Sequence, residues 1–307
     1  MRSSIEDHDR FVPVLSVAVA LVLALVSIGF LIFFINNIAR SIQAEVILER
    51  IARDSLKLVD DLFPEEVGEP AAGRAEPAQL PAGDGCSAAA DHSGYLQSID
   101  EDEVLQIAVE HGLVIEMQCA IGDFVLAGDP LVRVWPADTA AGVLSEVSAL
   151  CTLGTERTHY QDIQRGIIEL LDIGVRALSP GVNDPTTALG CVDRLTQVLA
   201  ALGTRRAPDA ARLGEDGSLR FIARRPEFTD IIQLSYGELR HHGAATPAVA
   251  LRLVDSMRRV AQRVSAERRA ALQDQLAELA VAVRQKVQHP GDLRRIEQAI
   301  ADARSAA

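Results

Sequence analysis

The residues best suited to bind a ligand gather in one short stretch of the sequence, Ser179-Pro180-Gly181-Val182-Asn183-Asp184-Pro185-Thr186-Thr187. Pro180 and Gly181 are typical of a helix end, whereas Asp184 followed by Pro185 is typical of the start of the next helix. These roles leave several polar side chains unexplained, and beside a helix N-terminus they could bind an anion or a small polar molecule. The predicted ligand-binding residues are Arg176, Ser179, Asn183, Asp184, Thr186 and Thr187.

A stripe of charged side chains marks the helix expected just before this stretch, over residues 156–178. At 100° per residue, one side of that helix carries Asp162, Arg165, Glu169, Asp172 and Arg176. A stripe of mixed charge is most simply a solvated face with ion pairs between residues three or four apart. The alternative is that it forms the wall of a polar cleft or pore.

Catalytic chemistry is not favoured by the sequence. Asp172, Asp184 and His159 are the plausible acid–base or metal residues, and the two aspartates could instead hold a cation through their oxygens. They lack the spacing that a nucleophile and its base require, so we predict no catalytic residue and no bound metal. A Gly-Lys-Ser/Thr motif is missing, which excludes a Walker-type phosphate-binding loop, and no cofactor is expected. The cysteines are far apart and predict neither a zinc site nor a disulfide.

An apolar stretch near the N-terminus is long enough to cross a lipid bilayer. Residues 11–39 contain 29 consecutive positions without a formal charge. The 24 residues from Val12 to Ile35 would form a helix of about 36 Å, against about 30 Å of hydrocarbon. A cleaved signal peptide would have a shorter apolar region, of about 7–15 residues. We therefore predict a short N-terminal flank (1–10) and a transmembrane helix over residues 11–37.

Charge distribution predicts the orientation of that helix and restricts the partners. The residues before it include Arg2 and Arg10, whereas the residues after it include Arg40, Arg50, Arg53 and Lys57. Because positive residues favour the cytoplasmic side, we expect the C-terminal domain in the cytoplasm. The net charge of −13 disfavours nucleic acid as a partner and disfavours a domain lying flat on anionic lipid.

The remaining chain predicts a mainly α fold with a small β-module. Apolar residues at helical intervals indicate a stalk helix over 38–63, and a Pro-, Gly- and Ala-rich composition indicates a flexible linker over 64–92. Strand-like runs and glycine turns predict a β-module over 93–136. Its Gly-Asp-x-Val-x-x-Gly-x-x-Leu pattern resembles half of a biotinyl- or lipoyl-type β-sandwich, but the lysine that such carriers modify is missing.

A helical domain is predicted over residues 137–307, ending in a helical bundle. In its last third, apolar residues recur three and four positions apart, which is the spacing of helices packed on helices. These residues are Ala250, Val254, Met257, Val260 and Val264 on one helix and Leu272, Leu276, Leu279 and Val283 on the next.

Several strings in the sequence together resemble a known family. They are ALSPGVNDPTTA, the preceding LLDIGVRA, the pair GYLQSID and GDFVLAGDPL, and the membrane entry FVPVLSVAVALVLAL with IARSIQ. The chain resembles, over about residues 10–300, the uncharacterised bacterial membrane proteins known as domain of unknown function 2254. This resemblance implies an inner-membrane protein and supplies no activity or catalytic residue. Family members carry further membrane helices upstream, so a lone anchor is not a complete membrane domain.

The sequence thus predicts a membrane-anchored homo-oligomer whose cytoplasmic domain senses a ligand or assembles a complex. Its expected partners are the lipid bilayer, further copies of the chain and a small polar or ionic ligand. One alternative is a subunit of a channel or transporter, although a single helix cannot line a path by itself. A less favoured alternative is a membrane-tethered enzyme that uses Asp172 and Asp184.

Overall fold

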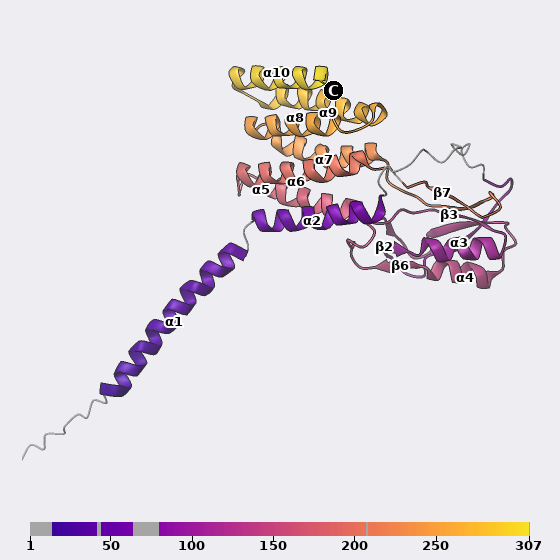
Figure 1. Ribbon diagram of the computed structural model, residues 1–307, viewed down its shortest axis with the longest axis horizontal. Helices are drawn as coiled ribbons and strands as arrows, with labels where there is room; N and C mark the ends of the chain where they lie inside the picture. Colours follow the sequence, from indigo (N-terminus) through magenta and orange to yellow (C-terminus); the bar gives the residue numbers. More distant parts are fainter. Residues whose placement is uncertain (1–13, 42–43, 64–79, 207, 307) are drawn as a thin grey trace, which may run out of the picture. The chain divides into compact units, whose positions relative to one another are not determined.

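The computed structural model describes residues 14–41, 44–63, 80–206 and 208–306. The predicted N-terminal flank and residues 64–79 of the predicted linker lie outside these ranges. The described part is mainly helical and contains a small sheet module, as expected (Figure 1). The chain divides into two compact units, Met1–Ile47 and Leu48–Ala307.

Helix α1 (Val14–Ser41) contains most of the predicted transmembrane segment. Its 20 residues from Ser16 to Ile35 have a mean hydropathy of 3.0, and none of their side chains is buried by protein. Apolar side chains that meet no protein partner are suited to lipid, and this stretch is long enough to cross a bilayer. The structure thus contains one candidate membrane span among the described residues.

Helix α2 (Ala44–Leu62) corrects the expectation of a stalk over residues 38–63. One face of the helix is buried in the helical core, through Leu48, Ile51, Ala52, Ser55, Leu58 and Val59. A Cβ added to Gly166 of helix α5 would lie only 2.0 Å from the Ser55 hydroxyl, which shows how closely α2 approaches α5. The amphipathic pattern therefore predicted a helix correctly, but its apolar face packs on the helical domain.

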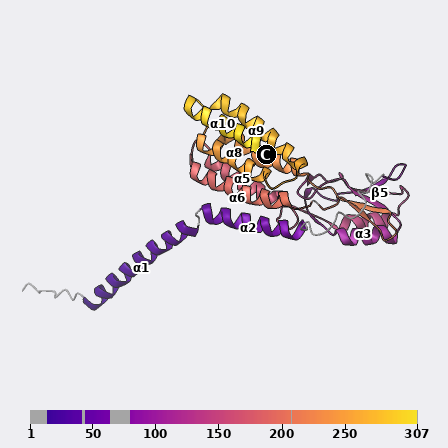
Figure 2. The ribbon, with the colours of Figure 1, turned by 45° about the horizontal axis from the view of Figure 1, so that its top comes forward.

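Six helices form a two-layered stack against the buried face of α2. They are α5 (Ile163–Ala177), α6 (Pro185–Thr204), α7 (Phe228–Gly243), α8 (Pro247–Ala261), α9 (Ala266–Lys286) and α10 (Pro290–Ala306). In one layer α7 packs between α5 and α9, and in the other α8 packs between α6 and α10. Figure 1 shows the helices stacked from α5 to α10 in chain order, and Figure 2 shows the same stack turned by 45°. Each helix contacts mainly its neighbours in the stack.

The core of the stack confirms the predicted helix-on-helix packing. All nine apolar residues assigned to the two packing faces between Ala250 and Val283 are buried. Burying a side chain such as Leu276 or Leu279 contributes roughly 1.5–3 kcal/mol, so these faces supply much of the stability of the stack.

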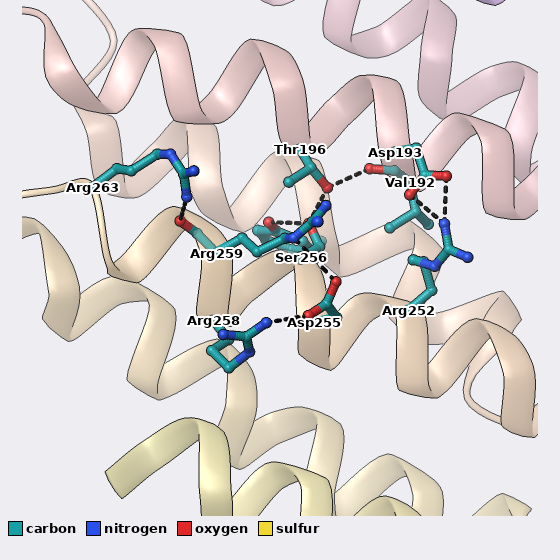
Figure 3. Close-up of polar contacts among 10 residues, drawn as sticks. Val192, Asp193, Thr196, Arg252, Asp255, Ser256, Arg258, Arg259 and Arg263 are labelled. Atoms are coloured by element: carbon teal, nitrogen blue, oxygen red, sulfur yellow. Dashed lines mark hydrogen bonds and ion pairs between the residues drawn. The ribbon is translucent and has the colours of Figure 1, made fainter. Parts of the chain in front are cut away.

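Three hydroxyl groups interrupt this apolar core where α6, α7 and α8 meet. Thr196 donates to the carbonyl oxygen of Val192 (2.6 Å), and its Oγ1 lies 2.6 Å from Ser256 Oγ, as Figure 3 shows. The buried Tyr236 hydroxyl lies 2.8 Å from the same Ser256 oxygen. Because every member has a partner, the group fixes the three helices against one another without leaving a buried polar atom unpaired.

The sheet module consists of two sheets and two helices, α3 (Glu101–Glu110) and α4 (Ala141–Ala149). The larger sheet has the order β1 (Cys86–Ala89), β5 (Pro130–Trp135), β3 (Val114–Met117), β8 (Leu219–Ile222) and β7 (Ala211–Leu213). All its neighbours are antiparallel except β3 and β8, which are parallel. The smaller, antiparallel sheet has the order β4 (Phe124–Val125), β2 (Gly94–Ile99) and β6 (Cys151–Gly154).

The extent of this module differs from the predicted range of 93–136. Strand β1 lies within the predicted linker, whereas β6, β7 and β8 lie within the predicted helical domain. The β7–β8 hairpin follows α6 in the chain and pairs with β3, through Ile115 opposite Phe221. Such short, distant strands carry too little alternation of their own to be recognised. The prediction of a β-sandwich is not confirmed.

Candidate ligand site at the α5–α6 connection

The connection between α5 and α6 is a tight turn held by its own backbone. The Asn183 N–H donates to the carbonyl oxygen of Ser179 (2.9 Å), and the Asp184 N–H donates to that of Ala177 (2.8 Å). Asn183 has a φ of 47°, in the left-handed region, which asparagine tolerates better than most residues. The turn therefore depends little on the rest of the protein for its shape.

Asp184 caps helix α6, as its position before Pro185 predicted. Its Oδ1 accepts a hydrogen bond from the Thr187 N–H (3.1 Å), and its Oδ2 accepts one from Thr187 Oγ1 (2.6 Å). These bonds from the Thr187 side chain and then its backbone hold the pKa of Asp184 below its usual value. Both residues thus have a structural role, since they satisfy a free N–H group of the helix start.

The other four predicted ligand residues divide into two kinds. Ser179 Oγ donates to the carbonyl oxygen of Arg176 (2.7 Å), so this hydroxyl stabilises the end of α5. Arg176, Asn183 and Thr186 are exposed, and their side chains make no hydrogen bond or ion pair with any residue that the structure describes. A ligand would therefore meet these three side chains first, and their role in binding stays a prediction.

The members of the predicted polar stripe on α5 differ in their burial and in their partners. Asp162 is buried, caps α5 through the Gln164 N–H (3.0 Å) and pairs with Arg157 (2.6 Å). Glu169 contacts Arg165 (2.9 Å) and His159 (3.1 Å), which gives a separate, half-buried ion cluster.

The last members of the stripe, Asp172 and Arg176, are exposed. The predicted stripe thus divides into three parts: Asp162 caps the helix, Glu169 belongs to an ion cluster, and Asp172 and Arg176 form an exposed end.

A groove of about 600 Å³ lies near the connection, where the first turns of α6 and α8 approach α10. Among the residues of the segment 179–187, only Pro185 lines this groove. Its wall includes Arg252, whose guanidinium pairs with Asp193 across the α6–α8 contact (Figure 3), and Arg295. The polar residues predicted to bind a ligand therefore lie beside the groove and do not line it.

The described residues offer little for metal or thiol chemistry. Within those residues, no group of three or more His, Cys, Asp or Glu side chains could hold a metal ion. Burial raises the pKa of Cys119 to about 11 and the pKa values of Cys151 and Cys191 to about 12. These thiols stay protonated at neutral pH and are weak nucleophiles.

A second, more polar cleft of about 620 Å³ was not anticipated from the sequence. It contains Glu101 of α3, Arg212 of β7 and Arg225, which follows β8. More than one hundred residues separate Glu101 from each arginine, and no motif connects them. Only the pairing of the distant β7–β8 hairpin brings these charges together.

The chain belongs to the family of predicted membrane proteins called DUF2254, whose model matches residues 1–259. It is 35% identical over 277 residues to the uncharacterized protein Rv1290c of Mycobacterium tuberculosis and to the uncharacterized protein Mb1321c of Mycobacterium bovis. The aligned region covers 88% of this chain and 53% of each relative, so the chain spans about half the length of these relatives. The search of solved structures gave no match.

Proposed function

We propose that the chain is a membrane-anchored, homo-oligomeric protein whose domain from Leu48 onwards lies in the cytoplasm and senses a ligand or assembles a complex. The observation that supports the membrane anchor is the contrast between the two units. Side chains from Ser16 to Ile35 of α1 are exposed and apolar, whereas the second unit buries its apolar side chains in its own cores. Lipid around α1 and water around the second unit would suit these two kinds of surface.

Helix α2 begins only a few residues after α1 ends, and its buried face is in contact with the helical core. The chain connection between the apolar helix and that core is therefore short, which is compatible with a sensing role.

The cytoplasmic location can be tested by thiol labelling in intact bacterial cells. The Cys86→Ser variant removes the least buried of the native thiols, since Cys119, Cys151 and Cys191 are buried. On that background, Ala301→Cys places an exposed reporter on α10, and Ser3→Cys places one before the apolar helix. A membrane-impermeant maleimide should label Ser3→Cys in intact cells and Ala301→Cys only after the inner membrane is opened. Labelling of Ala301→Cys in intact cells would overturn the orientation.

The assembly part of the proposal has its own test. Native mass spectrometry of the full chain in detergent should show more than one copy per particle. A single copy at every protein concentration would contradict a homo-oligomer, and it would leave the orientation unaffected.

A further inference from the structure

The polar cleft of about 620 Å³ combines two features that small-molecule sites share. It lies where separate parts of the fold meet, between the end of α2, the start of α3 and the β7–β8 hairpin, and it brings several polar groups together. The side chains that matter for the argument are Ser98, Glu101, Thr152, Tyr160, Arg212 and Arg225.

One carboxylate in the cleft serves two guanidinium groups. Arg225 Nη2 donates to Glu101 Oε1 (2.8 Å) and Oε2 (2.7 Å), and Arg212 Nη2 donates to Oε2 (3.2 Å). The Glu101 side chain is only 19% exposed, so this pairing is partly shielded from water. These three groups alone carry a formal charge of +1, because each arginine stays protonated, whereas the lining as a whole carries −2 once Asp61, Asp100 and Asp102 are counted.

These arginines have more N–H groups than Glu101 can accept. A guanidinium carries five N–H donors, whereas a carboxylate accepts a limited number. The Nε of Arg225 is buried and has no hydrogen-bond partner among the described residues. Since that Nε has almost no accessible surface, a ligand in the cleft would meet the exposed parts of the two guanidinium groups, whose side chains are 42% (Arg212) and 29% (Arg225) exposed.

We propose that this cleft binds a small organic anion through one carboxylate or phosphate group, which Arg212 and Arg225 hold in competition with Glu101. Oxyanions of this kind match the forked geometry of a guanidinium. Glu101 occupies part of that fork when the ligand is absent. Ligand binding thus exchanges one carboxylate partner for another oxyanion.

The size and the rim of the cleft restrict the ligand further. A volume of about 620 Å³ suits a metabolite-sized molecule and is too small for a polymer. Asp61, Asp100 and Asp102 also line the cleft, and their charges disfavour a ligand with several phosphates. The hydroxyl groups of Ser98 and Thr152 are suited to a polar body attached to the single anionic group.

The inference rests on the proposed sensing function and names the chemical class of its ligand. Isothermal titration calorimetry of the full chain in detergent can test it, with inorganic phosphate and acetate as probes and chloride to keep the ionic strength constant. Saturable binding of phosphate, of acetate or of both is expected, and a difference between the two probes identifies the anionic group.

Three substitutions distinguish a binding site from a structural ion cluster. Arg225→Gln should weaken binding about tenfold or more, since it removes a charged donor. Arg212→Gln should also weaken binding, and it disturbs the fold less because only one 3.2 Å contact is lost. Glu101→Gln should instead tighten binding severalfold, because it removes the charge that competes for the arginines. Arg206→Gln is the matched control, since Arg206 pairs with Asp209 and does not line the cleft.

Two results would overturn the inference. One is the absence of saturable binding of both probes to the parent chain and to Glu101→Gln. The other is binding that Arg212→Gln and Arg225→Gln leave unchanged. Neither result bears on the orientation or the number of copies in the assembly, so the cleft can fail as a site while the proposed membrane-anchored assembly stands.

Discussion

The contact between α2 and α5 at Gly166 allows a quantitative test of where α2 packs. A Cβ added to Gly166 would lie 2.0 Å from Ser55 Oγ and 3.3 Å from Ser55 Cβ. Since a carbon and an oxygen atom that are not bonded approach to about 3.3 Å, the two helices would have to separate by about 1.3 Å or the serine would have to rotate. Overpacking of this kind costs about 1–3 kcal/mol, and the gain in helix propensity offsets at most about 1 kcal/mol.

We therefore expect Gly166→Ala to lower the free energy of unfolding by about 1–2 kcal/mol. For a domain of this size, thermal unfolding of the full chain in detergent should then shift down by about 2–8 °C, as followed by far-ultraviolet circular dichroism. Gly237→Ala is the matched control, because it lies within α7 and its added Cβ meets no atom within 4 Å. That variant should be unchanged or slightly more stable.

A double-mutant cycle shows whether the loss comes from Ser55 itself. Ser55→Ala removes the oxygen at 2.0 Å and leaves the 3.3 Å contact, so it should restore most of the stability of Gly166→Ala. We expect a coupling energy of about 1 kcal/mol between the two positions. If Gly166→Ala is as stable as Gly237→Ala, or if the two substitutions simply add, α2 does not pack on α5 in this way.

Four further outcomes can be measured. Asp184→Ala should lower the melting temperature at neutral pH, whereas Asp184→Asn should keep most of the parent melting temperature. The pKa of the Asp184 carboxyl is lowered in the folded state, so the stabilisation by this carboxylate is present above the unfolded pKa, near 3.8. It is lost as the pH falls through the folded pKa. Tyr236→Phe should cost about 0.5–1.5 kcal/mol in urea unfolding, because the buried Ser256 oxygen loses a partner. Leu276→Asp should prevent stable folding, whereas Val281→Asp on the exposed side of the same helix should be nearly neutral; equal melting temperatures for both would contradict the packing of α9. The intact mass should show no lipoyl or biotin group on residues 94–136, which contain no lysine, and a mass increment in this segment would refute that expectation.

Local sequence patterns were sufficient to predict those features that depend on the residues of a single helix. The apolar positions of α8 and α9 recur with the helical period, so their burial could be predicted without knowledge of the partner helices. Asp184 followed by Pro185 likewise specified both the cap and the start of α6, because capping depends on neighbouring residues. The sequence could not show that Ser179 and Thr187 were already bonded within the turn.

Features that depend on distant residues could not be predicted. The amphipathic face of α2 indicated that the helix packs on a partner but not which one. The sequence therefore predicts a stalk, whereas in the structure α2 packs beside Gly166. Arg212 and Arg225 reach Glu101 only through the pairing of β8 with β3, and no periodicity records that pairing. The cleft with these three residues therefore became visible only in three dimensions.

The parallel pairing of β3 with β8 has a consequence for the order of events during synthesis on the ribosome. Residue 116 of β3 leaves the ribosome about one hundred residues before its partner, residue 222 of β8. At about 5–20 residues per second, this strand edge waits some 5–20 seconds for its neighbour while α5 and α6 are made. An unpaired edge is a template for association with other chains, so a nascent chain that stalls in this interval is the one most exposed to aggregation.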